Sequence, residues 1–277
     1  MSLTSFQREL CRIIAVTRVA AGESYLAVGS ALNEWLQAPR TSRDSDLFHN
    51  TDEALQTTWR SDRRLLEARG FHLEVVREHP AFVEATVARG GEAVVMEWAR
   101  DSAYRFFPLM EHPVLGLTLH PFDLATNKVL ALVGRLEVRD WVDVIQCGEQ
   151  MQPLGYLAWA SCGKDPGFSP AAIVEHAARA RYCAAEVATL SFNGVAPDAA
   201  ALSQRWRGLL DTARTLLPLL PSAEVGRCVL FRGADELYRG GPDALAEDLA
   251  RGRIQFHEGC LRGALPTPVL PGRTAAG

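Results

Sequence analysis

The chain has 277 residues, of which 48% are hydrophobic and 22% charged, and its formal net charge is −4. This composition is typical of a globular protein and excludes a disordered or fibrous one. No apolar run approaches the roughly 18–20 residues of a spanning helix, which excludes an integral membrane protein. The first residues lack the pattern of a signal peptide, so we expect a cytoplasmic protein. Nucleic-acid-binding proteins usually carry a clear excess of basic residues, which this chain lacks. A local basic patch on an acidic protein could still bind nucleic acid.

The first 120 residues predict a block that mixes helices and strands. Apolar residues at intervals of three and four predict helices over 3–21, 31–36 and 52–69. Buried or alternating patterns predict strands over 25–29, 44–48, 72–77, 82–88 and 93–100. Gly90-Gly91 is a hairpin signal between the last two of these strands, so this edge of the sheet is expected to be antiparallel.

The rest of the chain predicts mostly helices. They are expected over 123–133, 140–150, 170–190 and 196–217. The final stretch, which contains the segments 228–231 and 236–239, a helix near 243–251 and a Pro-rich tail, predicts a small C-terminal subdomain. We therefore divide the chain into two predicted domains, 1–120 and 121–277.

A first group of residues suits a nucleoside triphosphate and a metal. Gly29 and Ser30 form the turn between a short predicted strand and a helix, whose free N–H donors and positive end favour phosphate. Asp44 and Asp46 share one face of the next predicted strand. Two such carboxylates repel each other unless a cation lies between them, and Mg²⁺ uses carboxylate oxygens together with phosphates.

Each half of this pattern also has an ordinary explanation. Gly-Ser is a common helix start, and Asp-x-Asp is a common solvated strand face or turn. In this order, however, they resemble the signature of the polymerase-β-like nucleotidyltransferases. The chain departs from that signature at Ser45, where such proteins usually carry an aliphatic residue.

A second group of charged residues lies between 123 and 143. Lys128, Arg135 and Arg139 would share one face of a continuous helix, and such a cationic stripe suits phosphates. Gly134 predicts a break, after which Asp140 would cap a second helix. The alternative is an ordinary helical hairpin with ion pairs on a wet surface.

Lysine is rare in this chain, which makes its position informative. Of 29 basic residues only Lys128 and Lys164 are lysines. A lysine within an otherwise apolar helix supplies a compact, flexible charge that can reach a triphosphate.

Together the motifs resemble the AbiEii/AbiGii toxin family of nucleotidyltransferases. The resemblance rests on the Gly-Ser turn, on Arg40-x-Ser42-x-Asp44-x-Asp46 and on the block from Asp123 through Lys128 to Asp143. It covers roughly residues 24–145 and implies an α+β fold, in which a minimal nucleotidyltransferase sheet with flanking helices precedes a mostly helical domain. It also implies that an NTP binds with Mg²⁺, or Mn²⁺ in its place, in the cleft between the domains. Members act as toxins of bacterial toxin–antitoxin or phage-defence pairs, and some transfer nucleotides to the acceptor end of tRNA.

The resemblance also assigns roles to residues. Asp44 and Asp46 would hold the metal ions, and Gly29 and Ser30 the β- and γ-phosphates. Glu97 is the expected third metal carboxylate because it is the only acid in its apolar run, and Asp101 is the substitute.

The second motif receives roles in the same way. Lys128 would contact the triphosphate and neutralise the leaving pyrophosphate. Arg139 is a further candidate nucleotide contact. Asp143 is expected in the catalytic site, and Asp143 or Asp140 could orient Lys128 or Arg139. Arg40 and Arg43 flank the metal strand and are candidate contacts for phosphate or RNA.

Three functions remain open at this stage. The first is a toxin that transfers NMP from an NTP to RNA, such as the 3′ end of tRNA, and has a separately encoded antitoxin. The second is a transferase acting on a small hydroxylated molecule of the aminoglycoside type. The third is a non-catalytic nucleotide-binding module of the same fold, which Ser45 and the uncertain third carboxylate would favour.

Overall fold

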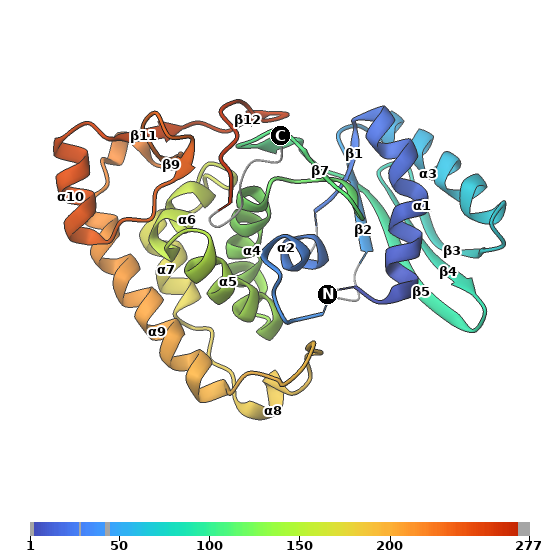
Figure 1. The fold of residues 1–277 in the computed structure, drawn as a ribbon, viewed down its shortest axis with the longest axis horizontal. Coiled ribbons are helices and arrows are strands. Elements are labelled where there is room, and N and C mark those ends of the chain that lie inside the picture. The colour runs from blue at the N-terminus through green and yellow to red at the C-terminus, as the bar shows by residue number, and fades with distance from the viewer. Residues whose placement is uncertain (1–2, 28, 42–44, 271–277) are drawn as a thin grey trace. The chain divides into compact units, whose positions relative to one another are not determined.

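A computed structural model describes residues 3–27, 29–41 and 45–270 (Figure 1). The chain divides into two compact units. The first comprises residues 1–103 and 109–120, and the second comprises 104–108 and 121–277. The short segment 104–108 therefore belongs with the second unit although it precedes the predicted boundary at 120. Among the described residues, no helix is long and apolar enough to cross a membrane.

Seven strands form the sheet of the first unit, in the order β3-β4-β5-β2-β1-β8-β7. β2 is parallel to β5 and β1 is parallel to β8, whereas the other neighbours are antiparallel, so the sheet is mixed. The strands are β1 (Ser24–Leu26), β2 (Ser45–His49), β3 (His72–His79), β4 (Phe82–Arg89), β5 (Glu92–Arg100), β7 (Met110–His112) and β8 (Gly116–Thr118).

Three helices belong to the same unit: α1 (Ser5–Ala21), α2 (Gly29–Leu36) and α3 (Asp52–Glu67). The side chain of Thr4 caps α1 in a capping box with Gln7. Gly22 ends that helix in the left-handed conformation that glycine adopts without strain. Figure 1 shows α1 and α3 side by side, and both pack against the sheet.

The sheet face beneath α3 is apolar. Leu47, Met96 and Trp98 point to it and are almost completely buried. The Trp98 ring packs against Trp59 of α3, with ring centroids 4.7 Å apart, and its Nε1 donates to Asp62 over 3.0 Å. Side chains alternate along a strand, so the residues between these, such as Asp46 and Glu97, point to the opposite face.

Asp62 makes this core sensitive to pH. Burial raises its pKa to about 6, although the charge of buried Arg18 and hydrogen bonds from Trp98 and Thr17 act in the other direction. An acid with a raised pKa favours the folded state when protonated. Its contribution is therefore complete below the unfolded pKa of about 4 and is lost as the pH rises through about 6.

We expect the stability of the wild type relative to an Asp62→Asn variant to fall by about 2 kcal/mol between pH 4 and pH 7. Urea unfolding of both proteins measures this difference. The difference is needed because burial lowers the pKa of His49 to about 4, which destabilises the fold as the pH falls over the same range. A difference that stays constant with pH would refute the prediction.

The second unit is mostly helical. Its longer helices pack on one another (Figure 1) and enclose a core that includes Tyr156, Trp159 and Leu216. The helices are α4 (Pro121–Arg135), α5 (Val138–Gln150), α6 (Leu154–Ser161), α7 (Pro170–Ala177), α8 (Ala184–Val187), α9 (Ala199–Leu216) and α10 (Pro242–Ala250), with 3₁₀ turns at Leu217–Leu219 and Ser222–Glu224.

Two small sheets complete this unit. β10-β9-β11 packs on the helical core through Val229 and Ile254, and β6 pairs with β12. The strands are β6 (Tyr104–Arg105), β9 (Cys228–Phe231), β10 (Glu236–Leu237), β11 (Ile254–His257) and β12 (Cys260–Leu261).

Some expected helices differ in the structure. The single helix predicted over 170–190 is wrong, because the chain leaves the helix after Ala177 and only the short α8 follows. The sequence pattern also missed α6, whose eight residues are all buried. A helix that is buried on every side has no polar face, so it lacks the periodicity by which helices are predicted.

Candidate functional site

Three carboxylates form a row across neighbouring strands of the first unit. Asp46 of β2 is paired in register with Glu97 of β5, and Glu97 is paired in turn with Glu84 of β4. Residues paired in this way point to the same face, with Cβ atoms about 5 Å apart. The row therefore lies on the face opposite Trp98. Its three members are only partly buried.

The Asp46 end of the row opens into a cavity. This cavity has a volume of about 610 Å³, and both Asp46 and Glu97 line it. Thr4 and Gln7 from the start of α1 contribute further polar groups to its wall. Glu84 is not among its lining residues and instead lies 3.9 Å from the guanidinium of Arg77 on β3. The two carboxylates that share the cavity are thus the pair suited to a cation.

The carboxylate pair fits a divalent metal ion in its chemistry. Hard cations take oxygen ligands, and two adjacent carboxylates repel unless a positive charge lies near them. Asp44, the predicted partner of Asp46, lies outside the described residues. Among the residues that are described, no group of three or more acidic, His or Cys side chains is close enough to hold a metal.

The other predicted residues of the first unit have distinct surroundings. Gly29 and Ser30 form the first turn of α2 and are buried. Asp101, the substitute for Glu97, follows β5, where its backbone N–H donates to His49 and its carboxylate accepts from Tyr25 over 3.2 Å. Asp101 is therefore placed beside the far end of β2 rather than beside Asp46.

The flanking arginines give less support to a role in binding. Arg40 is buried, and its guanidinium donates to the carbonyl of Thr41 over 3.1 Å. A buried side chain in such a position contributes to the structure of the segment that leads to β2. Arg43 lies outside the described residues.

The second motif forms a hairpin of α4 and α5 in the second unit. The two helices are interrupted as predicted, since α4 ends at Arg135 and Leu136 takes a positive φ of 51°. The ammonium of Lys128 lies 2.8 Å from a carboxylate oxygen of Asp140 and 3.4 Å from one of Asp143. Both aspartates therefore orient Lys128, which is one of the roles expected from the sequence.

This ionic cluster is buried rather than spread over a wet surface. The side chains of Asp140 and Asp143 are at most 1% exposed, and that of Lys128 is 13% exposed. Burial alone would raise the pKa of Asp140, but hydrogen bonding to Arg135 and the charge of Lys128 outweigh it and lower that pKa. An ammonium has three N–H groups, so two carboxylates leave one for a ligand.

Two expectations about this hairpin need correction or refinement. The expectation that Asp140 caps α5 is wrong, because Glu137 is the N-cap residue, and the side chain of Glu137 makes no capping hydrogen bond. Asp140 instead accepts from Lys128 and Arg135. Arg139 forms an ion pair with Glu137, with its Nε 2.6 Å from a carboxylate oxygen. Because α4 and α5 are separate helices, the stripe of Lys128, Arg135 and Arg139 that one continuous helix would present does not form.

Asp123, at the start of the same motif, has a structural environment. Its carboxylate accepts the backbone N–H groups of Phe106 and Phe107 over 2.9 and 3.1 Å. It also pairs with Lys164 over 2.8 Å. Asp123 therefore holds the segment 104–108 onto α4, and both lysines of the chain sit in ion pairs on that helix.

Glu84 is the member of the carboxylate row that the sequence analysis missed. The signal was nevertheless present. A two-residue turn at Gly90-Gly91 pairs Arg89 with Glu92, and counting outward from that pair places Glu84 opposite Glu97.

Comparison with known proteins supports the fold. No family model and no curated protein matches the chain. The solved structures that are similar to it include the following two. JHP933 from Helicobacter pylori is 14% identical with a TM-score of 0.51, and the match covers 78% of this chain and 95% of that one. MenT4, a nucleotidyltransferase toxin from Mycobacterium tuberculosis H37Rv, is 15% identical with a TM-score of 0.51, over 79% and 83% of the chains. At such identities the similarity concerns the fold, and it agrees with the predicted α+β class.

Proposed function

We propose that the protein is a metal-dependent nucleotidyltransferase that moves NMP from an NTP to a hydroxyl acceptor. The observation that carries this proposal is the in-register pair of Asp46 and Glu97 on one face of the sheet, beside a cavity that both line. The fold shared with MenT4, a nucleotidyltransferase toxin, supports the same reaction. Membership of the AbiEii/AbiGii toxin family, which the sequence motifs resemble, is also part of this proposal.

The proposed roles follow from the chemistry of each residue. Mg²⁺ or Mn²⁺, when bound, would neutralise phosphate charge and lower the pKa of the attacking hydroxyl. Asp46, with Asp44 and Glu97, supplies carboxylate oxygens for that ion. Gly29 and Ser30 supply backbone N–H groups at the start of α2 for the phosphates.

Lys128 supplies the charge for the leaving group. The acceptor oxygen forms a bond to the α-phosphorus, the bond to the bridging oxygen breaks, and pyrophosphate leaves with added negative charge. Lys128 can donate to that pyrophosphate through the N–H that Asp140 and Asp143 leave available. The two aspartates keep the ammonium in place, since Asp140 accepts one of its protons and Asp143 forms an ion pair with it.

We further propose RNA, such as the 3′ end of tRNA, as the acceptor and a toxin role with a separately encoded antitoxin. MenT4 is described as a toxin, which supports this assignment. The second candidate is a small hydroxylated acceptor of the aminoglycoside type, because its transfer would use the same Gly-Ser and Asp-x-Asp elements.

The acceptor is tested by incubating the purified protein with Mg²⁺, each of the four α-labelled NTPs and total RNA. We expect label in tRNA-sized RNA, with affinity for RNA that falls steeply as salt is added. Label on an added aminoglycoside alone, with weak salt dependence, would favour the second candidate. NTP binding without transfer to any acceptor would favour a non-catalytic module.

A further inference from the structure

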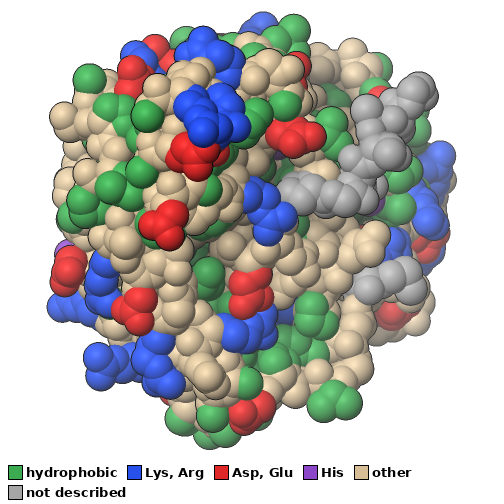
Figure 2. Space-filling model, turned by 60° about the vertical axis from the view of Figure 1, so that its left-hand side comes forward, with side chains coloured by type: hydrophobic (Ala, Val, Ile, Leu, Met, Phe, Trp, Pro, Cys, Tyr) green, Lys and Arg blue, Asp and Glu red, His purple; other side chains and the backbone are tan. Residues whose placement is uncertain are grey.

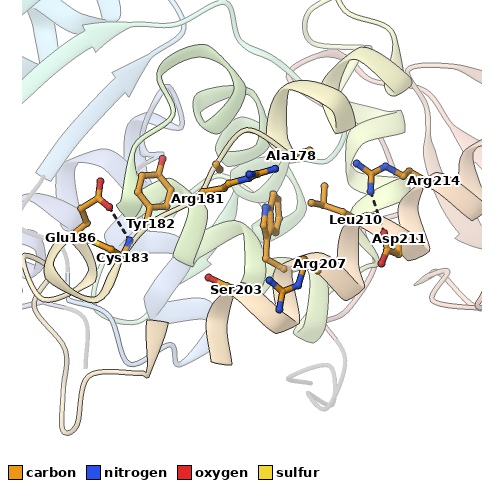
Figure 3. Close-up of a pocket in the computed structure, with 12 residues that line it drawn as sticks. Ala178, Arg181, Tyr182, Cys183, Glu186, Ser203, Arg207, Leu210, Asp211 and Arg214 are labelled. Carbon is orange, nitrogen blue, oxygen red and sulfur yellow. Dashed lines mark hydrogen bonds and ion pairs between the residues drawn. The ribbon is translucent and has the colours of Figure 1, made fainter. Parts of the chain in front are cut away.

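The second unit contains a cavity of about 760 Å³ that none of the predicted site residues lines. One wall is α9, and the other is the segment from Ala178 to Glu186 that includes the break between α7 and α8 (Figure 3). The cavity is therefore built at the place where the predicted helix 170–190 is interrupted.

Basic side chains dominate this cavity once its internal ion pairs are considered. Of its two acids, Asp211 pairs with Arg214 over 3.1 Å, and Glu186 accepts the backbone N–H of Cys183 over 2.9 Å (Figure 3). Arg181 and Arg207 come from the two opposite walls and are exposed. Neither guanidinium has a hydrogen bond or ion pair among the described residues. These two cations are thus available to an anion.

Trp206 adds a buried donor to the same wall. Its side chain is 3% exposed and lines the cavity, yet its Nε1 has no hydrogen-bond partner among the residues that the structure describes. A buried N–H without a partner is costly and is rare in folded proteins. A ligand that accepts a hydrogen bond in the cavity would remove this cost.

The cavity is also connected to the Lys128 hairpin. Tyr182 lines it, and its hydroxyl donates to the carbonyl of Leu136 in the turn between α4 and α5. The Tyr182 ring packs on Trp141, the residue after Asp140, with centroids 5.2 Å apart. A ligand in the cavity would therefore lie against the same hairpin that holds Lys128.

We propose that this cavity binds phosphate groups of the RNA acceptor strand. Arg181 and Arg207 would contact phosphate oxygens, and Trp206 would donate to one of them. The identity of the strand rests on the proposed function, whereas the anion site rests on the cavity itself. Basic and acidic side chains are interspersed on the face drawn in Figure 2, so such a local site agrees with the net charge of −4.

Cys183 reports directly on occupancy because it lines the cavity and is exposed. Cys260 is the other exposed cysteine among the described residues, and the remaining four are buried. In the full-length Cys260→Ser protein, we expect a single-stranded RNA of about ten nucleotides to slow maleimide labelling of Cys183 at least about fivefold. Inorganic phosphate at the same concentration is expected to protect only weakly. Equal labelling with and without RNA would overturn the proposal, and protection by phosphate alone would overturn its assignment to RNA.

Substitutions then identify the contacts. Arg181→Gln and Arg207→Gln are each expected to weaken RNA binding about tenfold. The salt dependence of binding reports the number of phosphates contacted, and each substitution is expected to lower that number by about one. Arg179→Gln is the matched control, because Arg179 is equally exposed and close in sequence but does not line the cavity. Equal effects of all three would refute a specific site.

This test separates the site from the proposed function. If RNA protects Cys183 but no nucleotide is transferred, the site stands and the transferase proposal fails. If nucleotides are transferred to RNA without protection of Cys183, the transferase stands and the site fails.

Discussion

An Asp46→Asn variant is expected to transfer nucleotides at least about 100-fold more slowly than the wild type while keeping the stability of the wild type. The substitution removes one negative charge from the face that we propose to bind the metal ion, but it preserves the size of the side chain. Asp46 is partly exposed beside a cavity, so the core beneath it, which contains Leu47 and Trp98, is not disturbed. Initial rates with an α-labelled NTP measure the loss, and urea unfolding measures the stability.

Two neighbouring variants sharpen this prediction. Glu97→Gln, which alters the register partner of Asp46, is expected to lower transfer strongly as well. Glu84→Gln is the matched control, because Glu84 lies in the same row but faces Arg77 and does not line the cavity. We expect the control to retain activity within about threefold, since ordinary surface changes have small effects. Equal losses for Glu84→Gln and Asp46→Asn would argue against a specific metal pair.

A Lys128→Met variant is expected to lose both stability and activity. Without the ammonium, the carboxylates of Asp140 and Asp143 both lose their contact with Lys128, whereas Asp140 retains Arg135. Removing one member of a buried ion pair costs about 3–5 kcal/mol, and the remaining contact with Arg135 places this variant near the lower value. Transfer per folded molecule is expected to fall at least about 100-fold, because the leaving pyrophosphate loses its cation.

Lys164→Met separates these two effects. Lys164 is the other lysine, is similarly buried and pairs with Asp123 on the same helix. We expect a comparable loss of stability in urea unfolding but an unchanged rate per folded molecule, measured at a temperature at which both variants remain folded. If the two lysine variants show equal rates per folded molecule, Lys128 has only a structural role.

Much of the first unit could be predicted because its residues follow simple periodic patterns. The alternation along 82–88 and 93–100 and the Gly90-Gly91 turn predict β4 and β5 with their hairpin, and the structure has both. The same turn determines the register that places Glu84 opposite Glu97. The parallel pairing of β2 with β5 joins distant segments, so no local pattern could reveal that Asp46 lies beside Glu97.

The second unit was less predictable for a related reason. The break at Gly134 was visible in the sequence, but the burial of Asp140 and Asp143 depends on how α4 and α5 pack. Capping was therefore assigned to Asp140 from local sequence alone, whereas the ion pair with Lys128 determines its position. The cavity around Trp206 also depends on packing, because its walls come from α9 and from the interrupted segment after α7.

The most direct test of nucleotidyl transfer follows two labels in parallel. The wild-type protein is incubated with Mg²⁺ and RNA and with NTP labelled at either the α- or the γ-phosphate. Attack on the α-phosphorus predicts α-label in the RNA and γ-label in free pyrophosphate, with neither product in Asp46→Asn. Appearance of γ-label in the RNA, or equal incorporation of α-label by wild type and Asp46→Asn, would contradict the account.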